Sequence, residues 1–450
     1  MNIKQFSDKA LAHYSYAILS EGKMVIIDPS RNPQPYYAYA EENKAKIVAV
    51  IETHPHADFV SSHLQIHQET GATIYTSQLV GAEYPHESFD DGNIITLGKI
   101  TLSAINSPGH SPDSICVYAE NNEDINDKVL FTGDTIFIGN VGRPDLRENV
   151  GNMQAKREEL AKAMYKTIQT KFNNIPDNTI IYPAHGAGSL CGKNMSSASS
   201  STMGEERQSN WAFQKQTEEA FVAEILKDQP MVPHYFGFDV DTNKAGADHY
   251  ERSVGKVPRL INRSKVEKNI LVIDTREISD FKAGHLPNSI NIEAIREAQK
   301  LETWLGAIVK PREAFYLVVD SVNQFDTYLE RIAKIGYEKQ LKGIVTIEHR
   351  LLKTSSKISA NELKGNEDKY TIVDIRNLSE VEENKPFAHS VHIPLHELRD
   401  RAHQISSANG KPIVVHCAAG YRSAAGSSIL ENTFHEAEIY DLSDDIKAFM

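Results

Sequence analysis

The sequence predicts an α/β protein in which an N-terminal sandwich of sheets precedes two doubly wound α/β domains. Three observations predict this fold class. Up to about Phe221, short runs of branched apolar residues end in loops rich in His, Asp and Gly. A segment with Pro, Gly and charge but no sustained period follows. Beyond it, a motif near residue 269 returns near residue 369, which indicates an internal repeat.

The N-terminal part contains four segments of the same build, each a buried strand that delivers a polar loop. These segments are "KMVIIDPS", "KIVAVIETHPH", "VLFTGDTIFIG" and "NTIIYPAHG". Because each loop follows the carboxyl end of its strand, the four loops can converge along one edge of the sandwich. The later stretch "SSASSSTMGEE" is typical of a flexible Ser-rich loop.

The repeat is carried by "NILVIDTREISDF" and "KYTIVDIRNLSEV". In both copies an Asp, an Arg and a Ser stand at the same spacing, and helical patterns such as "FDTYLERIAKIG" alternate with strands. A chain of 450 residues is several times the usual domain size of about 100 to 200 residues. We expect domains at 1–230, 257–352 and 353–450, with a linker at 231–256.

Composition excludes several partners. The chain has 61 acidic and 48 basic residues, a formal charge of −13, and no Lys/Arg block, which argues against nucleic acid. No apolar run approaches membrane-spanning length, and the N-terminus lacks the pattern of a signal peptide. The three cysteines are far apart and odd in number, as expected of a reducing compartment: Cys116, Cys191 and Cys417. We therefore expect a cytoplasmic protein.

The polar loops carry residues that bind metals. His54 and His56 stand two apart in "THPHADF", with Asp58 following, and imidazole suits zinc or iron. Three later strand ends or turns add further candidates: His110 in "SPGHSPDS", Asp134 in "FTGDTIF" and His185 in "YPAHGAG". A single His in a loop means little, but this set in this order predicts a metal site.

These motifs, with "FTGDTIFIGNVGRPD" and "PAHGAGSLCGK", resemble the metallo-β-lactamase superfamily, and more closely its persulfide dioxygenase branch fused to rhodanese domains. The resemblance implies an N-terminal αββα sandwich and two rhodanese-like domains. It also implies one Fe(II) per chain, held by His54, His110 and Asp134. Two histidines and a carboxylate leave coordination positions open, which suits dioxygen chemistry.

Phe59 distinguishes this loop from that of a related enzyme class. A binuclear zinc thioester hydrolase of the glyoxalase II type, similar in fold, needs a second metal whose ligands would include Asp58, residue 59 and His185. Phenylalanine cannot ligate a metal. His56, Asp58 and His185 are then expected either to orient ligands or water, or to stabilise the loop by hydrogen bonds. The hydrolase remains the alternative function, and a non-enzymatic sulfur carrier is a third.

Two further residues near these motifs have open roles. Arg143 in "GNVGRPD" could attract an anionic persulfide, or it could pair with Asp145 or a carbonyl to hold the loop. Cys191 lies in the Gly-rich loop "GSLCGK", which we expect to be accessible, and it could relay sulfur or be structural. Cys116 alternates within "SICVYA" and is expected in the core.

"VVHCAAGYRSAAG" places Cys417 directly after a buried strand and before a helical run. The small residues that follow let backbone N–H groups surround one sulfur, and the helix dipole and Arg422 add positive charge. A Cys-x4-Arg loop fits sulfur, and the string resembles an active rhodanese loop, with Cys417 the nucleophile. The matching position in the first repeat is Ser321, which cannot carry a persulfide, so that copy is expected to be inactive.

The two sites share an intermediate. The resemblance implies a dioxygenase that oxidises a small-molecule thiol persulfide with O2 to sulfite and thiol, and a rhodanese that forms thiosulfate from that sulfite. Sulfide detoxification would be the biological role. The expected partners are the persulfide, O2 and sulfite. Members of this family often form oligomers, so the resemblance implies a homo-oligomer. The identity of the thiol is left open.

Overall fold

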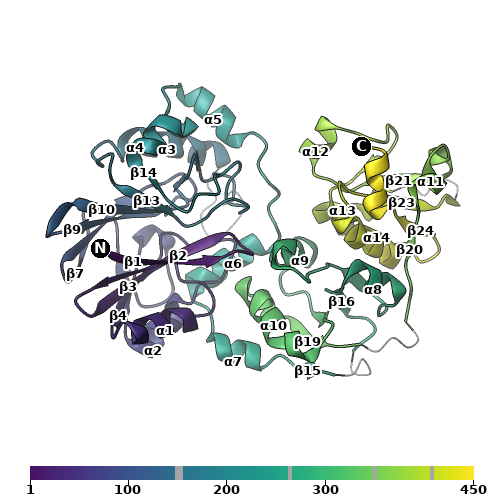
Figure 1. Cartoon of the computed structure of the whole chain (residues 1–450), viewed down its shortest axis with the longest axis horizontal. Coiled ribbons are helices and arrows are strands. Elements are labelled where there is room, and N and C mark those ends of the chain that lie inside the picture. The colour runs from purple at the N-terminus through teal and green to yellow at the C-terminus, as the bar shows by residue number, and fades with distance from the viewer. Residues whose placement is uncertain (147–155, 262–265, 348–351, 406–409) are drawn as a thin grey trace. The chain divides into compact units, whose positions relative to one another are not determined.

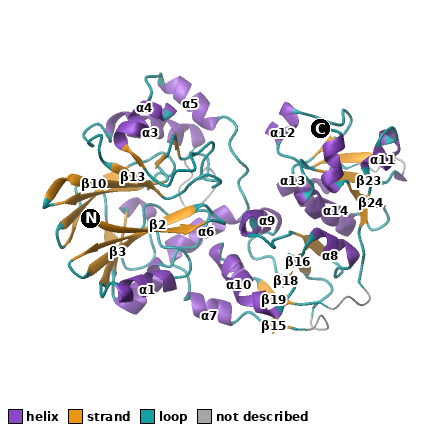
Figure 2. Cartoon of the chain, in the orientation of Figure 1, coloured by secondary structure: helices purple, strands orange, loops and turns teal. Residues whose placement is uncertain are grey.

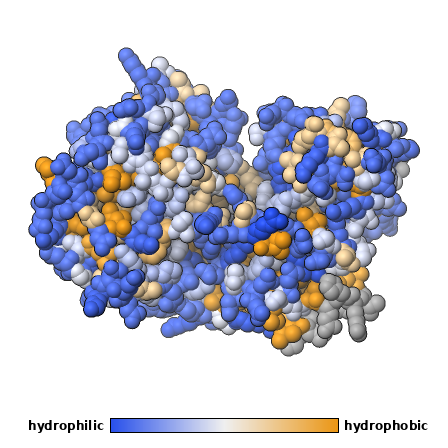
Figure 3. All heavy atoms as spheres, viewed as in Figure 1, coloured by the Kyte–Doolittle hydropathy of each residue, from blue (hydrophilic) through white to orange (hydrophobic). Residues whose placement is uncertain are grey.

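The computed structural model describes residues 1–146, 156–261, 266–347, 352–405 and 410–450. The chain divides into two compact units (Figure 1). The first comprises 1–253 with 333–336, and the second 254–332 with 337–450. Hydrophilic residues cover most of the face seen in Figure 3. No helix in the described part of the chain has both the length and the apolar character to cross a membrane.

The first unit contains two six-stranded sheets (Figure 2). One sheet follows chain order: β1 (Asn2–Asp8), β2 (His13–Ser20), β3 (Lys23–Ile27), β4 (Lys46–Ile51), β5 (Thr73–Thr76) and β6 (Glu87–Ser88). The other runs β14 (Ser201–Thr202), β13 (Ile180–Pro183), β10 (Asp124–Gly133), β9 (Ile115–Asn121), β8 (Ile100–Asn106) and β7 (Ile94–Leu97). A small hairpin joins β11 (Ile136–Phe137) to β12 (Asn140–Val141).

Apolar side chains of both sheets meet in one buried cluster, which includes Ile27, Ile51, Val117 and Phe131. The outer faces are covered by helices. A second cluster joins the first sheet to α1 (Gln34–Glu42) and α2 (His63–Thr70), and a third joins the second sheet to α3 (Arg157–Thr170), α4 (Met203–Ser209) and α5 (Glu218–Leu226). With both faces covered, a strand such as β4 is almost continuously apolar. The predicted αββα sandwich is confirmed.

Two segments differ from the sequence-based expectation. The stretch described as a Ser-rich loop contains β14 and the start of α4, where Thr202 and Glu205 form a reciprocal capping box. The stretch predicted as a linker forms two helices, α6 (Tyr235–Ala245) and α7 (Tyr250–Gly255). Helix α6 forms because Tyr235, Phe236 and Val240 become buried, which the local sequence pattern did not indicate.

The second unit contains two five-stranded parallel sheets with the same strand order. The first runs β15 (Arg259–Leu260), β19 (Leu341–Val345), β18 (Phe315–Val318), β16 (Leu271–Asp274) and β17 (Ser289–Asn291), with helices α8 (Ile278–Ala283), α9 (Leu301–Ile308) and α10 (Phe325–Lys334). The second runs β20 (Ser356–Lys357), β24 (Ile439–Asp441), β23 (Ile413–His416), β21 (Thr371–Asp374) and β22 (Val391–His392), with α11 (Ala360–Leu363), α12 (Leu378–Glu383), α13 (Leu395–Arg401) and α14 (Tyr421–Thr433). The two predicted α/β repeats are therefore present.

The motif shared by the repeats is a buried ion pair. In the first copy Arg276 donates from Nη2 to Asp274 Oδ2 at 2.7 Å, and in the second Arg376 donates to Asp374 at 2.6 Å. Each arginine also donates to a backbone carbonyl eight residues further along the chain. Two bonds between a guanidinium and a carboxylate fix geometry as well as charge. The repeated Asp-x-Arg therefore holds the turn that follows β16 in the first copy and β21 in the second.

Candidate metal centre and sulfur-transfer loop

Three of the predicted residues converge at the edge of the sandwich. His54 follows β4, His110 lies in the turn between β8 and β9, and Asp134 follows β10. All three are buried, and one ligand atom from each lies within 4.8 Å of the others. Asp134 Oδ2 is 3.8 Å from His54 Nε2 and 3.5 Å from His110 Nε2. The structure thus brings together two imidazoles and one carboxylate that are distant in sequence.

Hydrogen bonds fix which nitrogen of each histidine carries the proton. Thr53 donates its hydroxyl proton to Asp28 at 2.9 Å, so its oxygen accepts from His54 Nδ1 at 3.0 Å. His110 Nδ1 donates to the backbone carbonyl of Arg143 at 2.9 Å. In the neutral form, each histidine therefore presents an unprotonated Nε2 toward Asp134, as metal-binding imidazoles do.

The electrostatics of the site favour a neutral His54 and an ionised Asp134. Burial, helped by the nearby His56, holds the pKa of His54 well below its ordinary value, so the imidazole is neutral. Burial alone would raise the pKa of Asp134, but the charge and hydrogen bond of His185 outweigh it and keep the carboxyl ionised. Asp134 Oδ2 is buried and accepts no hydrogen bond from the residues that the structure describes. This arrangement fits a divalent cation, which would satisfy that oxygen.

Gly142 allows the loop after β12 to pass close to these groups. A Cβ atom at this position would lie 1.9 Å from the backbone oxygen of Asp134 and 3.0 Å from His110 Nδ1. Either contact would displace a predicted metal ligand. Only glycine can therefore bring the neighbouring Arg143 carbonyl to His110.

Beside the triad, Asp58, His185 and Cys191 also have ligand atoms within 4.8 Å of one another, but His185 is engaged in other interactions. His185 makes close contacts with two carboxylates: Nδ1 with Asp134 at 2.7 Å and Nε2 with Asp58 at 2.8 Å. Burial would lower the pKa of His185, but these two carboxylates raise it well above its ordinary value. Phe59 is 1% exposed and stacks on His56 with ring centroids 4.3 Å apart. His185 is thus a protonated imidazole between the carboxylates of Asp134 and Asp58, and the ring of Phe59 lies near it.

His56 faces away from this position, toward carboxylates that the sequence reasoning missed. Its Nε2 lies 3.2 Å from Asp28 and 3.6 Å from Glu52. Burial lowers the pKa of His56, but the two carboxylates more than compensate and raise it. A possible signal was present, since Asp28 and Glu52 both stand at the ends of buried strands. With His56 they form a further buried cluster whose ligand atoms lie within 4.8 Å of one another.

Helix α6 holds the loop that carries His54 and His56. Asn243 on this helix donates from Nδ2 to the backbone carbonyls of His56 at 2.8 Å and Phe59 at 2.7 Å. Its Oδ1 accepts from the N–H of Ser61 at 2.8 Å. The segment expected to be a linker therefore fixes the conformation of the metal-binding loop.

Cys191 is buried, which corrects the expectation of an accessible loop. Its side chain is 1% exposed and lies near Asp58 and His185. The loop folds inward because the Cys191 carbonyl accepts from the Arg143 N–H at 3.0 Å. Burial, followed by the nearby Asp58, raises the pKa of the thiol well above its ordinary value. The residue is a protonated thiol in this state, and a role in sulfur relay stays a prediction.

Of the two roles considered for Arg143, the structure shows the one in which its side chain pairs with Asp145 and a backbone carbonyl and so holds the loop. Its Nε and Nη2 both donate to Asp145 at 2.6 Å, and Nη1 donates to the carbonyl of Leu190 at 3.1 Å. The side chain is 1% exposed. The backbone carbonyl of Arg143 meanwhile orients His110. Attraction of an anionic substrate by the guanidinium stays a prediction.

Cys417 lies at the carboxyl end of β23, directly before the loop that starts α14. The N–H of Gly420 donates to Cys417 Sγ at 3.2 Å. Gly420 has a φ of +95°, and a Cβ there would lie 2.8 Å from the backbone nitrogen of Asp444. The tight loop therefore needs glycine at the residue whose N–H contacts the sulfur.

Arg422 is paired with a residue that was not predicted. Its guanidinium donates to both oxygens of Glu380, at 2.6 and 2.7 Å. Burial would lower the pKa of Arg422, but Glu380 raises it, as does Cys417 more weakly. Glu380 also caps α12, so the capping pattern "NLSE" was the available signal. The positive charge next to the loop is thus balanced.

The first repeat replaces this loop with a turn. Ser321 follows β18 as Cys417 follows β23, and its hydroxyl accepts from the N–H of Asn323 at 3.2 Å. That bond caps a short 3-10 helix, Val322–Gln324. The hydroxyl therefore has a structural role at the position where the second repeat carries a thiol.

An αββα sandwich with a His, His and Asp triad at its edge defines a metalloenzyme of the metallo-hydrolase class. The family model described as the metallo-beta-lactamase superfamily matches residues 8–185, and the rhodanese-like domain model matches 255–343 and 359–450. A crystal structure of a metallo-beta-lactamase from Staphylococcus aureus subsp. aureus COL is 30% identical. The match covers 77% of this chain and 99% of that one, with a TM-score of 0.67. The chain belongs to the metallo-beta-lactamase superfamily and carries two rhodanese-like domains.

Relatives of two activities match the first unit. A probable hydroxyacylglutathione hydrolase of Schizosaccharomyces pombe is 28% identical over 225 residues, which are 44% of this chain and 81% of that protein. The mitochondrial persulfide dioxygenase of Bos taurus is 26% identical over 245 residues, 54% of this chain and 87% of that protein. The protein is therefore an enzyme related to both groups, with rhodanese domains appended.

Proposed function

We propose that this protein is a mononuclear iron persulfide dioxygenase coupled to a sulfurtransferase. The observation that carries the proposal is the contrast between two adjacent positions. His54, His110 and Asp134 face one another with unprotonated nitrogens and a buried carboxylate oxygen. At the neighbouring position Phe59 stands where a ligand is needed, and both nitrogens of His185 lie against carboxylates. The third group at that position, Cys191, is a buried thiol whose pKa is raised, so the residues favour one metal at the triad over a second beside it.

His54, His110 and Asp134 would hold Fe(II), which supplies redox chemistry with dioxygen and keeps open coordination positions. The surrounding residues prepare these ligands. The Thr53 hydroxyl and the Arg143 carbonyl orient the two imidazoles, and His185 holds a proton between Asp134 and Asp58. Phe59 packs against His56 and His185. The balanced reaction consumes one persulfide, RSSH, one O2 and one water, and yields RSH, sulfite and two protons.

The second activity uses Cys417. Its thiolate attacks the outer sulfur of a persulfide, the S–S bond of the donor breaks, and the donor thiol leaves as Cys417 becomes Cys-S-SH. Sulfite then attacks that outer sulfur, which regenerates the Cys417 thiolate and releases thiosulfate. The Gly420 N–H, 3.2 Å from Sγ, stabilises the thiolate in both steps. The proposed partners are accordingly a low-molecular-weight thiol persulfide, O2 and sulfite.

The proposal is tested by oxygen uptake with persulfide substrates. The iron-loaded protein is expected to consume one O2 for each sulfite formed and to contain one iron per chain. Glutathione persulfide and coenzyme A persulfide serve as the substrates. Two zinc ions per chain, with hydrolysis of S-lactoylglutathione and no oxygen uptake, would instead establish the thioester hydrolase.

A Phe59→His variant is expected to bind a second metal. The new imidazole would add a strong donor beside Asp58 and His185, where the third nearby group, Cys191, is a buried thiol with a raised pKa. Metal analysis after saturation with zinc should give two ions per chain, against one for the unchanged protein. Phe59→Leu is the matched control, since it alters the same buried position without adding a donor. One ion per chain in both variants would contradict the explanation given for Phe59.

A further inference from the structure

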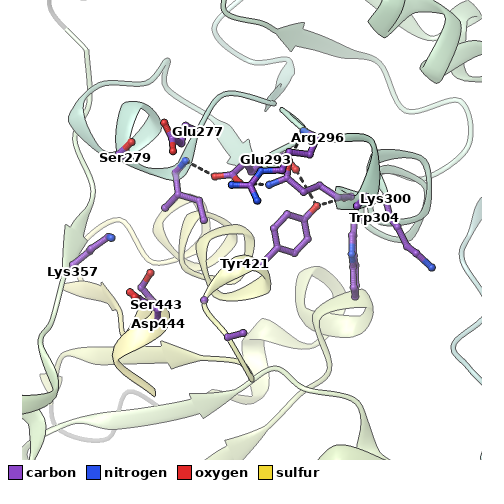
Figure 4. A pocket seen from close by; sticks show the side chains of 15 residues that line it. Glu277, Ser279, Glu293, Arg296, Lys300, Trp304, Lys357, Tyr421, Ser443 and Asp444 are labelled. Carbon is purple, nitrogen blue, oxygen red and sulfur yellow. Dashed lines mark hydrogen bonds between the residues drawn. The ribbon is translucent and has the colours of Figure 1, made fainter. Parts of the chain in front are cut away.

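One tyrosine of the sulfur loop reaches the other repeat. Tyr421 is the fourth residue after Cys417 and the first residue of α14. Its side chain extends from the second repeat to the first (Figure 4), where the hydroxyl lies 2.5 Å from the carbonyl oxygen of Gln299 and 3.1 Å from that of Glu293. Both repeats belong to the second compact unit. The sulfur loop is therefore tied directly to the repeat that lacks a cysteine.

The two carbonyls belong to a segment of the first repeat that is held by its own hydrogen bonds. The Glu293 carboxylate accepts from the Ile278 N–H at 2.8 Å and from the side-chain amide of Gln299. The side-chain oxygen of Gln299 accepts in turn from the Arg296 N–H at 2.7 Å. Because these bonds close the segment on itself, the carbonyls offer Tyr421 a fixed point of attachment.

The Tyr421 hydroxyl is a hydrogen-bond donor to this segment. Burial raises the pKa of Tyr421, so the phenol remains protonated. A hydroxyl that leaves water is costly unless it is hydrogen-bonded, and the two backbone carbonyls can only accept. The position of the Tyr421 ring is therefore set by the first repeat.

The first repeat has an aromatic ring at the same position but no hydroxyl. Phe325 is the fourth residue after Ser321 and begins α10, as Tyr421 is the fourth after Cys417 and begins α14. Phe325 is 5% exposed, so a ring without a hydroxyl packs well at the start of this helix. The hydroxyl thus occurs in the repeat that carries the thiol, while an aromatic ring alone is compatible with the fold.

Tyr421 directly follows the residue whose N–H contacts the sulfur. Gly420 donates to Cys417 Sγ at 3.2 Å and has a φ of +95°. Glycine has the widest choice of backbone conformations, so this N–H stays on the sulfur only if the chain around it is held. Beyond Gly420 two hydroxyls hold the chain: that of Ser423 donates to the Gly420 carbonyl at 2.9 Å, and that of Tyr421 reaches the first repeat. Loss of the second attachment would let the Gly420 N–H move away from Sγ.

We propose that Tyr421 is a positioning residue for sulfur transfer, through which the first repeat holds the Gly420 N–H on Cys417. The inference rests on the proposed sulfurtransferase activity and gives the repeat without a cysteine a role in it. In loading, the Cys417 thiolate bonds to the outer sulfur of the donor, whose S–S bond breaks, and the donor leaves as a thiolate. In transfer, sulfite takes that sulfur with its proton, and Cys417 leaves as the thiolate. An N–H held on Sγ favours the thiolate that loading requires and stabilises the thiolate that transfer releases.

The test measures both steps in a single turnover of the full-length protein by rapid-quench mass spectrometry. The donors are glutathione persulfide and coenzyme A persulfide, and the acceptor is sulfite. Tyr421→Phe is expected to lower the rate constants of loading and of transfer by about 3- to 10-fold, the effect of one hydrogen bond. The donor concentration that half-saturates loading, the fraction of Cys417 that becomes loaded and the melting temperature should stay unchanged. These three quantities distinguish positioning of the loop from a loss of folded protein.

Tyr337→Phe is the matched control. The Tyr337 hydroxyl donates to the Val309 carbonyl at 2.9 Å within the first repeat, so this variant loses the same kind of bond away from the sulfur loop. Its rate constants should equal those of the unsubstituted protein. An equal loss in Tyr337→Phe and Tyr421→Phe would overturn the inference. Unchanged rate constants in Tyr421→Phe, or a lower loaded fraction alone, would overturn it as well.

A double variant tests whether the first repeat acts through Tyr421. Gln299→Ala removes the side chain that closes the carbonyl-bearing segment and leaves the second repeat unchanged. This variant should slow both steps, and its combination with Tyr421→Phe should be no slower than Tyr421→Phe alone. Losses that add would overturn the inference, because the two residues would then act independently. Absence of any loading of Cys417 in the unsubstituted protein would refute the sulfurtransferase function and the inference with it, and is distinguishable from these results.

Discussion

Replacing Asp134 by asparagine is expected to abolish metal binding by the first unit. The substitution preserves shape but removes the charge that faces His54 Nε2 and His110 Nε2 at 3.8 and 3.5 Å. It also removes one of the two carboxylates that hold the proton of His185. The loss of affinity should exceed the roughly 10- to 100-fold that follows from removing a residue that only orients a ligand. Competition with a chelator, followed by metal analysis, measures it.

Asp90→Asn is the matched control for this variant. Asp90 accepts two hydrogen bonds in the same unit, from the Ser77 hydroxyl and the Gln78 N–H, but it is not one of the predicted ligands. Its variant should retain one metal per chain. Both variants should still load sulfur onto Cys417, which shows that the second unit is folded. Full metal occupancy in Asp134→Asn would refute the assignment of this carboxylate as a ligand.

Replacing Cys417 by serine is expected to stop thiosulfate formation while oxygen uptake continues. Serine fits the loop but cannot carry a sulfane sulfur, so sulfite should accumulate as the product of persulfide oxidation. Ion chromatography of sulfite and thiosulfate, together with an oxygen electrode, separates the two activities. The amount of thiosulfate formed should fall to that of a reaction without protein.

Cys116→Ser is the control for the loss of a thiol. Cys116 is buried in the first unit, and its Sγ donates to the Ser107 hydroxyl at 3.3 Å, a bond that serine can also make. This variant should form thiosulfate normally. Thiosulfate production that persists in Cys417→Ser would mean that another group carries the sulfur, and Cys191 would then be the first candidate to substitute.

The sequence was most informative where a residue type and a local pattern coincide. A sandwich of sheets and the two repeats follow from strand patterns and from a motif repeated at a constant offset, and the αββα arrangement was implied by the family resemblance. His54, His110 and Asp134 were each identified at a strand end or turn, and the structure brings them within 4.8 Å. Cys417 was identified because a small-residue loop follows a buried strand.

The partners of these residues were less accessible to prediction. Asp28 orients His54 through Thr53 although it lies 25 residues before that threonine. Glu380 pairs with Arg422 across 42 residues. Such contacts depend on which strands become neighbours, and the order of strands in a sheet cannot be read from a single sequence. Local patterns contain no record of the tertiary contacts that bury a loop.

The absence of tertiary contacts from local sequence patterns also explains the two expectations that were wrong. Cys191 was expected to be accessible because glycines surround it, but the loop is drawn inward by the Arg143 N–H. Helix α6 was expected to be a linker because Pro and Gly flank it, yet Asn243 places it against the metal-binding loop. In both cases a contact made elsewhere in the first unit outweighed the local composition.

The buried Asp-x-Arg pair of the two repeats has a consequence for the history of the chain. The ion pairs lie at the ends of β16 and β21, while the reactive loop follows β23, the strand beside β21. Determinants of folding and of chemistry therefore occupy separate positions. After a duplication, one copy can lose its nucleophile through neutral drift without losing its fold. The first repeat, with Ser321 at the position of Cys417, retains the ion pair and the fold.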